Sequence, residues 1–229
     1  MAEIIDVEEL IRTPPFELSE CDKLVLRTPE EIFVPHTWND IKTIIAGGDM
    51  SLLRRFPTHL ANYIVWTRET RLKVGSVLNF IIEARLHWKM ERPQSNPVFL
   101  FSSSTPFHDA TDYRILRNDW PYATMPGMVH LVVWSKTPVE TDEQGYPTSQ
   151  SRELIKNFLV RVFGPHMDKR QNAGDNIQWF RNPFHCQSVQ NIEHIHVILR
   201  DADQTFVTAL TGQTSDNILA NTYSPSKDS

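Results

Sequence analysis

The clearest strand pattern in the chain is Glu193-His194-Ile195-His196-Val197, which Ile198 and Leu199 continue. Successive side chains of a β-strand point to opposite faces, so His194 and His196 lie side by side on one face. The β-branched and aliphatic residues between and after them favour a strand. We therefore predict a strand from His194 to Leu199 that carries two adjacent imidazoles.

Two more segments have strand character, Met128 to Trp134 and Ile177 to Arg181. Both are rich in β-branched or aromatic residues, and we expect them to pair with the histidine strand in one sheet. A further short strand is predicted at Val98 to Phe101, within a long loop. Gln150 to Phe163 carries apolar residues at helical spacing and should cover one face of the sheet.

The N-terminal part of the chain predicts helices, because caps and apolar residues at helical spacing recur there. The predicted segments are Val7 to Ile11, Trp38 to Ala46 with Thr37 as N-cap, a short helix near Asp49, a longer helix from Pro57 that Gly75 interrupts, and Val77 to Leu86. The chain should thus be an α+β protein, with an N-terminal helical part followed by a small mixed or antiparallel sheet covered by helices. We divide it into an acidic N-terminal arm (1–36), a single α+β domain (37–211) and a polar C-terminal tail (212–229).

Composition places the chain among globular proteins. Its 229 residues, 40% of them apolar, can bury one substantial core. The chain shows no pattern typical of a secretory signal and no apolar stretch long enough to span a bilayer. Cys21 and Cys186 are too few for a disulfide scaffold and should be free thiols. We expect a cytoplasmic protein without a membrane partner.

The formal net charge of -5 conceals a strong segregation of charge along the chain. Residues 1–50 hold eleven acidic and four basic side chains, whereas residues 51–92 hold eight basic and three acidic ones. The overall acidity argues against general coating of DNA, but the basic region, with aromatic residues interspersed, could follow an RNA backbone. The alternative is a solvated helix face.

The paired histidines have three interpretations. Imidazoles exchange protons near neutral pH, so the pair could serve as base and acid in acyl transfer. With His130, His166 or His185 as a third ligand the pair could instead hold a metal ion, although none of these has diagnostic spacing. The histidines could also be purely structural. Cys186 and Ser188 are candidate nucleophiles just upstream, without a diagnostic motif around them.

The segment from Asp112 to Tyr122 combines acids, amides and aromatic rings. Such a mixture suits recognition of a cation, because a carboxylate accepts two parallel hydrogen bonds from a guanidinium and an aromatic face stacks on it. Alternatively, Asp119-Trp120-Pro121 forms a turn whose acid caps backbone amides. The residue types leave both interpretations open.

A series of runs occurs in a characteristic order along the chain. They are Thr37-Trp38-Asn39-Asp40, Leu53-Arg54-Arg55, Gly75-Ser76-Val77-Leu78-Asn79-Phe80, Asp112 to Tyr122, Val129 to Trp134, Trp179-Phe180-Arg181-Asn182 and Glu193 to Val197. Together, from Thr37 to Asp201, they resemble a fungal family that is named for an N-acetylglucosamine-induced protein and was long described as a domain of unknown function. Some members of that family are arginine-containing cyclodipeptide synthases.

The resemblance implies that residues 37–211 form the catalytic domain of a tRNA-dependent aminoacyltransferase of fungal secondary metabolism. Such an enzyme joins arginine from arginyl-tRNA to a second aminoacyl group and cyclises the product to a diketopiperazine. An aminoacyl ester is already activated, so the reaction needs orientation of two substrates and proton transfer rather than ATP. We therefore expect two charged tRNAs as partners, and neither a cofactor nor a metal.

The resemblance also implies roles for residues. The candidate catalytic residues are His130, Ser188, His194 and His196; those for substrate binding are Asp112, Asn118, Asp119, Trp120, Tyr122 and Glu193; those for tRNA binding are Arg54, Arg55, Arg68, Arg71 and Lys73. Two other functions remain open. One is a non-catalytic, small-molecule-binding regulatory protein of an N-acetylglucosamine response, and the other is a histidine-based metal-dependent hydrolase.

Overall fold

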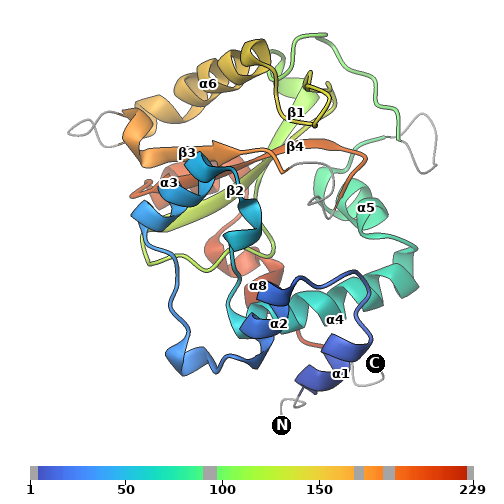
Figure 1. Ribbon diagram of the computed structural model, residues 1–229. Helices are drawn as coiled ribbons and strands as arrows, with labels where there is room; N and C mark the ends of the chain where they lie inside the picture. Colours follow the sequence, from blue (N-terminus) through green and yellow to red (C-terminus); the bar gives the residue numbers. More distant parts are fainter. Residues whose placement is uncertain (1–4, 90–96, 168–172, 183–188, 226–229) are drawn as a thin grey trace. The chain divides into compact units, whose positions relative to one another are not determined.

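The computed structural model describes residues 5–89, 97–167, 173–182 and 189–225 (Figure 1). The chain forms two compact units, and each unit is built from several separate segments. Unit 1 comprises residues 1–80, 118–126 and 215–229, and unit 2 comprises residues 81–117 and 127–214. The predicted α+β class is confirmed, whereas the predicted divisions at residues 36 and 211 do not coincide with the boundaries of these units.

Unit 2 contains a four-stranded antiparallel sheet with the strand order β1-β2-β4-β3. Its strands are β1 (Tyr113–Arg117), β2 (Met128–Ser135), β3 (Ile177–Phe180) and β4 (Glu193–Arg200). Three of them lie where the sequence predicts strands, and β1 lies in the segment from Asp112 to Tyr122, for which only a strand end and a turn are predicted. The strand predicted at Val98 to Phe101 is wrong, because these residues have no strand structure.

The pairing of β2 with β4 divides the sheet into an apolar and a histidine-bearing face. Leu131 is paired with Val197, and the next residue of β2, Val132, is paired with His196. Because neighbouring residues of a strand point to opposite faces, this register separates the two kinds of side chain. The apolar face carries Ile115, Val129, Leu131, Val133, Ile195, Val197 and Leu199.

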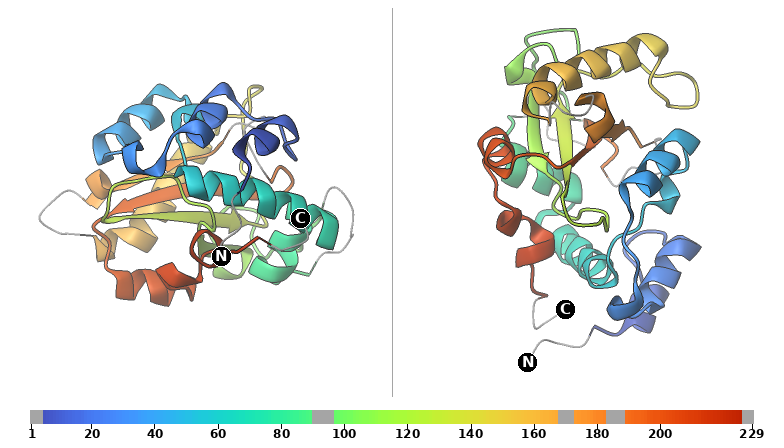
Figure 2. Two further views of the ribbon diagram at one scale, coloured as in Figure 1. Left: turned by 90° about the horizontal axis from the view of Figure 1, so that it is seen from below. Right: turned by 90° about the vertical axis from the view of Figure 1, so that its left-hand side faces the viewer.

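Helix α6 (Ser149–Phe163) covers the apolar face of the sheet, as predicted. The Thr148 hydroxyl caps its N-terminus by accepting from the backbone N–H of Ser151, and Ile155, Phe158 and Leu159 are buried against the strands. Figure 1 and the right-hand view of Figure 2 show α6 along this side of the sheet. Burial of aliphatic and aromatic side chains is the main stabilising contribution to such a layer.

A further helix of unit 2, α7 (Gln204–Thr211), secures the end of β1. Asp203 caps α7, and Gly212 ends it at a φ of 70°, a left-handed conformation that glycine adopts without strain. Beyond that glycine, the side-chain oxygen of Gln213 accepts from the backbone N–H of Arg117 at 2.9 Å, and its carbonyl accepts from the Arg117 Nε at 3.0 Å. The start of the predicted polar tail therefore belongs to unit 2.

The π-helix Ile81–Leu86 also lies in unit 2.

Unit 1 is helical, and α4 supplies much of its core. Its helices are α1 (Val7–Arg12), α2 (Glu20–Arg27), α3 (Trp38–Gly47), α4 (Pro57–Val74), α5 (Val77–Phe80) and α8 (Leu219–Thr222). The longest, α4, has 18 residues. Neither α4 nor another helix within the described ranges is long and apolar enough to cross a membrane.

The helix termini of unit 1 follow the predicted caps. Thr37 and Asp40 form a capping box in which each side chain accepts from the backbone N–H of the other residue, and Gly48 ends α3 at a φ of 77°. Pro57 begins α4, and Gly75 ends it. These positions confirm the predicted bounds of both helices to within a residue.

The acidic segment expected as an N-terminal arm packs into unit 1. Leu10 of α1 and Val25 and Leu26 of α2 are buried in the same cluster as Leu60 and Ile64 of α4. Because these side chains would otherwise remain in water, their burial holds α1 and α2 against α4. The described part of this segment is therefore part of the folded core of unit 1.

Helix α8 lies in the segment predicted to be a frayed tail. Asp119 holds its start, because the Asp119 carboxylate accepts from the backbone N–H of Leu219 at 3.2 Å and the Asp119 carbonyl from that of Ala220 at 2.8 Å. Ile218 and Ala220 are buried in the core of unit 1. The segment is thus folded as far as residue 225, where the described residues end.

Candidate functional site

Three histidines gather on the face of the sheet opposite α6. His194 and His196 alternate along β4, and His130 occupies the corresponding face of β2 because it is paired with Ile198. All three side chains are buried, with exposed fractions of 6% for His130, 4% for His194 and 8% for His196. Strand alternation thus places His194 and His196 on one face, as the sequence predicts, and the β2–β4 register adds His130.

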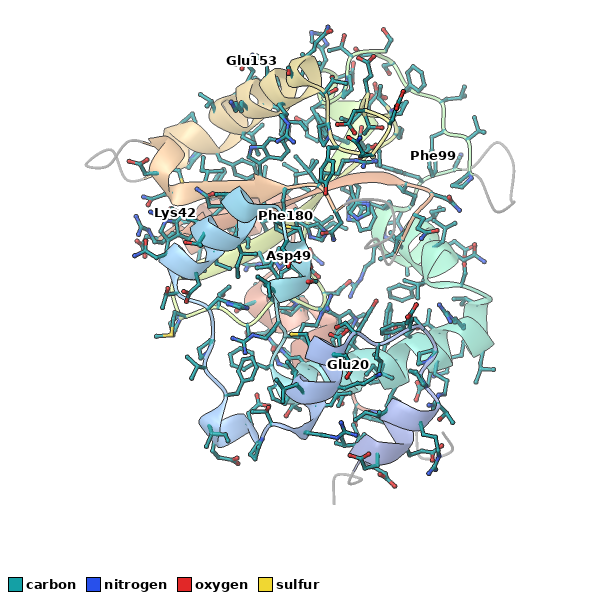
Figure 3. The ribbon with its side chains drawn as sticks, viewed as in Figure 1. Glu20, Lys42, Asp49, Phe99, Glu153 and Phe180 are labelled. Carbon is teal, nitrogen blue, oxygen red and sulfur yellow. The ribbon has the colours of Figure 1, made fainter. Side chains whose placement is uncertain are left out.

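His130 and His196 are joined by a hydrogen bond. His130 Nε2 lies 3.0 Å from His196 Nδ1, and the other ring nitrogen of His196 lies 3.3 Å from Nδ2 of Asn182. The ring of Phe180, labelled in Figure 3, stacks on the His196 ring with a centroid separation of 4.9 Å and an angle of 9°. Asn182 is a site residue that sequence analysis missed; the only signal was its place in the Trp179-Phe180-Arg181-Asn182 run.

His194 has a different hydrogen-bond partner. Its Nδ1 lies 2.9 Å from the carbonyl oxygen of Ile192, which can only accept, so this nitrogen carries the ring proton. Burial lowers the pKa of His194, with Arg181 adding to the shift, while the bond to Ile192 and the charge of Glu193 oppose it. The neutral ring therefore has its lone pair on Nε2, which can accept a proton.

Glu193 is occupied by a cation from its own chain. Arg181 donates to it through Nε at 2.7 Å and through Nη2 at 3.2 Å, in the bidentate geometry that guanidinium and carboxylate favour. Both side chains are about nine-tenths buried, with exposed fractions of 11% and 9%. The backbone N–H of Val139 also donates to the carboxylate at 3.3 Å. Arginine recognition by Glu193 would require a substrate to displace Arg181.

Asp112, also in unit 2, organises a loop. Its carboxylate accepts from the backbone N–H groups of Ser102 and Ser103, each at 2.8 Å, and its side chain is 1% exposed. These two N–H groups orient the carboxylate and tie it to the loop. This observed role accounts for Asp112 without a substrate.

The remaining predicted substrate-binding residues lie in unit 1. Asp119 caps α8, and the side chain of Asn118 accepts from the backbone N–H of Trp120 at 2.9 Å. The Trp120 ring is buried, with an exposed fraction of 4%, and packs against Tyr63 and Trp66 at centroid separations of 5.7 and 5.6 Å. The turn is therefore fixed by both caps and ring contacts.

Arg55 takes part in the same arrangement. Its Nε donates to the carbonyl oxygen of Trp120 at 3.0 Å, and its guanidinium lies 4.8 Å from the Tyr63 ring centroid and 5.2 Å from that of Tyr122. Cation–π contacts of this kind become stronger as water is excluded. Arg55 therefore supports the Asp119-Trp120-Pro121 turn, and replacing it would disturb unit 1 as well as any RNA contact.

The other predicted tRNA-binding side chains also contact their own chain. Arg68 and Arg71 donate to the carbonyl oxygens of Thr13 and Pro15, Lys73 forms an ion pair with Glu69 at 3.0 Å, and Arg54 lies over the Phe33 ring at 5.3 Å. Arg71 and Lys73 are exposed, whereas Arg54, Arg55 and Arg68 are half-buried. An RNA surface on α4 would therefore rest mainly on Arg71 and Lys73.

The structure does not place all of the other predicted residues. Ser188, His185 and Cys186 lie outside the described residues. His166 is exposed and stacks on Phe206 at a centroid separation of 3.8 Å. Among the residues that the structure describes, no group of three or more His, Cys, Asp and Glu side chains could hold a metal ion.

The chain belongs to a family described as a protein of unknown function, DUF3605, which matches residues 37–200. It is 31% identical over 200 residues to N-acetylglucosamine-induced protein 1 of Candida albicans, covering 81% of this chain and 76% of that protein. It is 27% identical over 188 residues to the uncharacterized protein YPL067C of Saccharomyces cerevisiae, covering 82% and 90%. The crystal structure of HTC1 is similar with a TM-score of 0.53 and 26% identity, covering 83% of this chain and 98% of that one. These matches confirm the predicted family named for an N-acetylglucosamine-induced protein, whereas the cyclodipeptide synthase activity stays a prediction.

The lowered pKa of His194 predicts a loss of stability in acid. The unfolded chain binds a proton near pH 6.5, whereas the folded chain resists it, so stability is fully present above about pH 6.5 and falls as the pH drops below it. Replacing His194 by Gln should therefore flatten the pH dependence of the unfolding free energy between about pH 5 and 7. Urea denaturation across this range measures the effect.

The exposed His108 offers a matched control for this measurement. His108→Gln shows what the loss of an exposed imidazole of the same unit does to the urea measurement. His36 and His59, whose pKa values burial also lowers, are present in both variants and contribute equally. Identical slopes for the wild type and His194→Gln would contradict a neutral His194.

Proposed function

We propose that the protein is a tRNA-dependent, arginine-containing cyclodipeptide synthase. It would join arginine from arginyl-tRNA to a second aminoacyl group and close the dipeptide into a diketopiperazine. The proposal comes from the resemblance of the sequence to family members with this activity. The observation that carries it furthest is the histidine group of unit 2, where one neutral imidazole has an acceptor nitrogen beside two hydrogen-bonded imidazoles.

The proposed chemistry uses groups of this kind. The amine of one aminoacyl ester attacks the carbonyl carbon of the other, a C–N bond forms and the C–O bond to the ribose breaks. The attacking amine loses a proton, and the departing ribose oxygen gains one. His194 Nε2 is suited to take the first proton and return it to the oxygen, because its ring is neutral and its Nδ1–H is already donated to Ile192.

We assign arginine recognition to Asp119 rather than to Glu193 or Asp112. Glu193 already binds Arg181, and Asp112 already accepts three hydrogen bonds from backbone amides. The carboxylate of Asp119, which accepts from the backbone N–H of Leu219, is the remaining predicted carboxylate and lies in the aromatic turn. Tyr122, which is half-buried, would provide aromatic surface for a guanidinium, whereas the buried Trp120 ring would support the turn.

The decisive experiment is reconstitution with purified tRNA, arginine, its synthetase and a second amino acid with its own synthetase, added one at a time. We expect a cyclic dipeptide containing arginine, detected by mass spectrometry. His194→Gln should lower kcat by about 10²- to 10⁴-fold, the range typical of a lost general base. His108→Gln, an exposed histidine of the same unit, should retain activity.

Absence of product with every second amino acid would overturn the proposal. In that case the alternatives separate by two further measurements. Metal analysis of the purified protein and of His196→Ala addresses a metal-dependent hydrolase. Binding of N-acetylglucosamine, measured by calorimetry, addresses a regulatory role in an N-acetylglucosamine response.

Asp119→Asn tests arginine recognition while preserving the turn, because an asparagine oxygen can still accept from the Leu219 N–H. Loss of a charged hydrogen bond to a guanidinium should lower kcat/KM for arginyl-tRNA about tenfold or more. Asp203→Asn makes the same change at the cap of α7 and should leave kcat/KM unchanged. Equal kcat/KM values for both variants would refute the assignment of Asp119.

The double variant Arg71→Gln, Lys73→Gln tests the tRNA surface, because these are the exposed members of the predicted group. If each side chain neutralises one phosphate, the plot of the logarithm of the association constant against that of the salt concentration should become less steep. The magnitude of its negative slope should decrease by about 1.4 to 1.8. Filter binding across salt concentrations measures it. The control is the double variant Arg152→Gln, Lys156→Gln, which removes the same charge from the exposed side of α6 and should keep the wild-type slope. Equal slopes for the two double variants would exclude α4 as the tRNA surface.

A further inference from the structure

Asn182, His196 and His130 form a chain of hydrogen bonds within unit 2. Asn182 Nδ2 lies 3.3 Å from His196 Nε2, and His196 Nδ1 lies 3.0 Å from His130 Nε2. The residues are buried, with exposed fractions of 7%, 8% and 6%. Phe180 lies parallel to the His196 ring and limits its rotation. Each bond therefore has one donor and one acceptor in a fixed orientation.

The direction of these bonds follows from the asparagine. An amide nitrogen can only donate, so His196 Nε2 accepts and carries no proton. A neutral His196 then has its proton on Nδ1 and donates it to His130 Nε2. The ring proton of a neutral His130 consequently resides on Nδ1. One amide group thus specifies the tautomer of two imidazoles.

We infer that Asn182 is a positioning residue that sets the tautomers of His196 and His130 and so gives His130 an N–H donor. Turning the amide by 180° would present its oxygen to His196, reverse both bonds and leave Nδ1 of His130 as an acceptor. The observed orientation of the amide, with Nδ2 toward His196 Nε2, is the one that places the ring proton of a neutral His130 on Nδ1.

The inference deepens the proposed function and, for its role in the reaction, rests on it. His130 and His194 lie on the same face of the sheet but offer different groups. His130 has a donor N–H at Nδ1, and His194 has an acceptor nitrogen at Nε2. Acyl transfer needs both, because the tetrahedral intermediate carries an oxyanion that N–H donors stabilise, while the amine must lose a proton. A neutral imidazole can serve as such a donor.

Nitrogen-15 NMR of the imidazoles tests the assignment without an activity assay. In the wild type, His196 Nε2 should resonate as an unprotonated ring nitrogen and Nδ1 as a protonated one. Asn182→Asp places a group that only accepts at the same position, so His196 should move its proton to Nε2 and His130 should reverse with it. His196→Gln assigns the signals.

Asn176→Asp is the matched control, because Asn176 is a buried asparagine of the same unit whose oxygen accepts from Arg200 at 2.9 and 2.6 Å. It should leave every imidazole resonance in place. A proton on Nε2 of wild-type His196 would overturn the assigned direction. Unchanged tautomers in a folded Asn182→Asp would overturn the role of Asn182, and if that variant does not fold, the wild-type spectrum alone decides the direction.

In the reconstituted reaction, Asn182→Asp should lower kcat by about 10²-fold or more, the cost typical of one lost oxyanion donor, with little change in KM. Wild-type kcat in that variant would overturn the catalytic part of the inference. If the wild type forms no product at all, the proposed function fails while the NMR result on Asn182 stands. The two failures are therefore distinguishable.

Discussion

The antiparallel register of β2 against β4 determines most of what is seen in unit 2. It pairs Leu131 with Val197 and Val132 with His196, so apolar side chains face α6 and imidazoles face the other way. A shift of one residue would turn the histidines into the core and the aliphatic side chains out of it. Because burying an unpartnered imidazole among apolar groups is costly, the same burial that stabilises the fold also fixes the site.

Local pattern was enough to predict much of this fold. Alternation gave the strand with His194 and His196, and the caps Thr37 and Gly75 gave the bounds of two helices. The misses have a physical reason too. Strand β1 has only five residues, in which two apolar residues lie side by side between two arginines, so no alternation marks it. Helix α8 has four residues, held chiefly by Asp119 and a tertiary core. Such elements depend on distant partners more than on propensity.

Only the part of the site that lies within a single strand could be predicted from the sequence. Two histidines on one strand follow from alternation. The addition of His130, which precedes His196 by 66 residues, depends on the register between β2 and β4. Asn182 could not be found by residue type, because a lone asparagine after a strand usually belongs to a turn. The acids illustrate the same limit. Sequence showed that Asp112 and Glu193 were candidates for binding a cation, but only the structure shows that amides and Arg181 already satisfy them.

The ion pair between Arg181 and Glu193 links these observations. Each partner is adjacent in sequence to a site residue, Arg181 to Asn182 and Glu193 to His194. A buried pair contributes little net stability, but removing one partner leaves an uncompensated charge at a cost of about 3 to 5 kcal/mol. The pair therefore resists separation of the end of β3 from the start of β4, which keeps Asn182 within reach of His196. A substrate guanidinium that displaced Arg181 would release that constraint, so the proposed recognition of arginine is better assigned to a carboxylate other than Glu193.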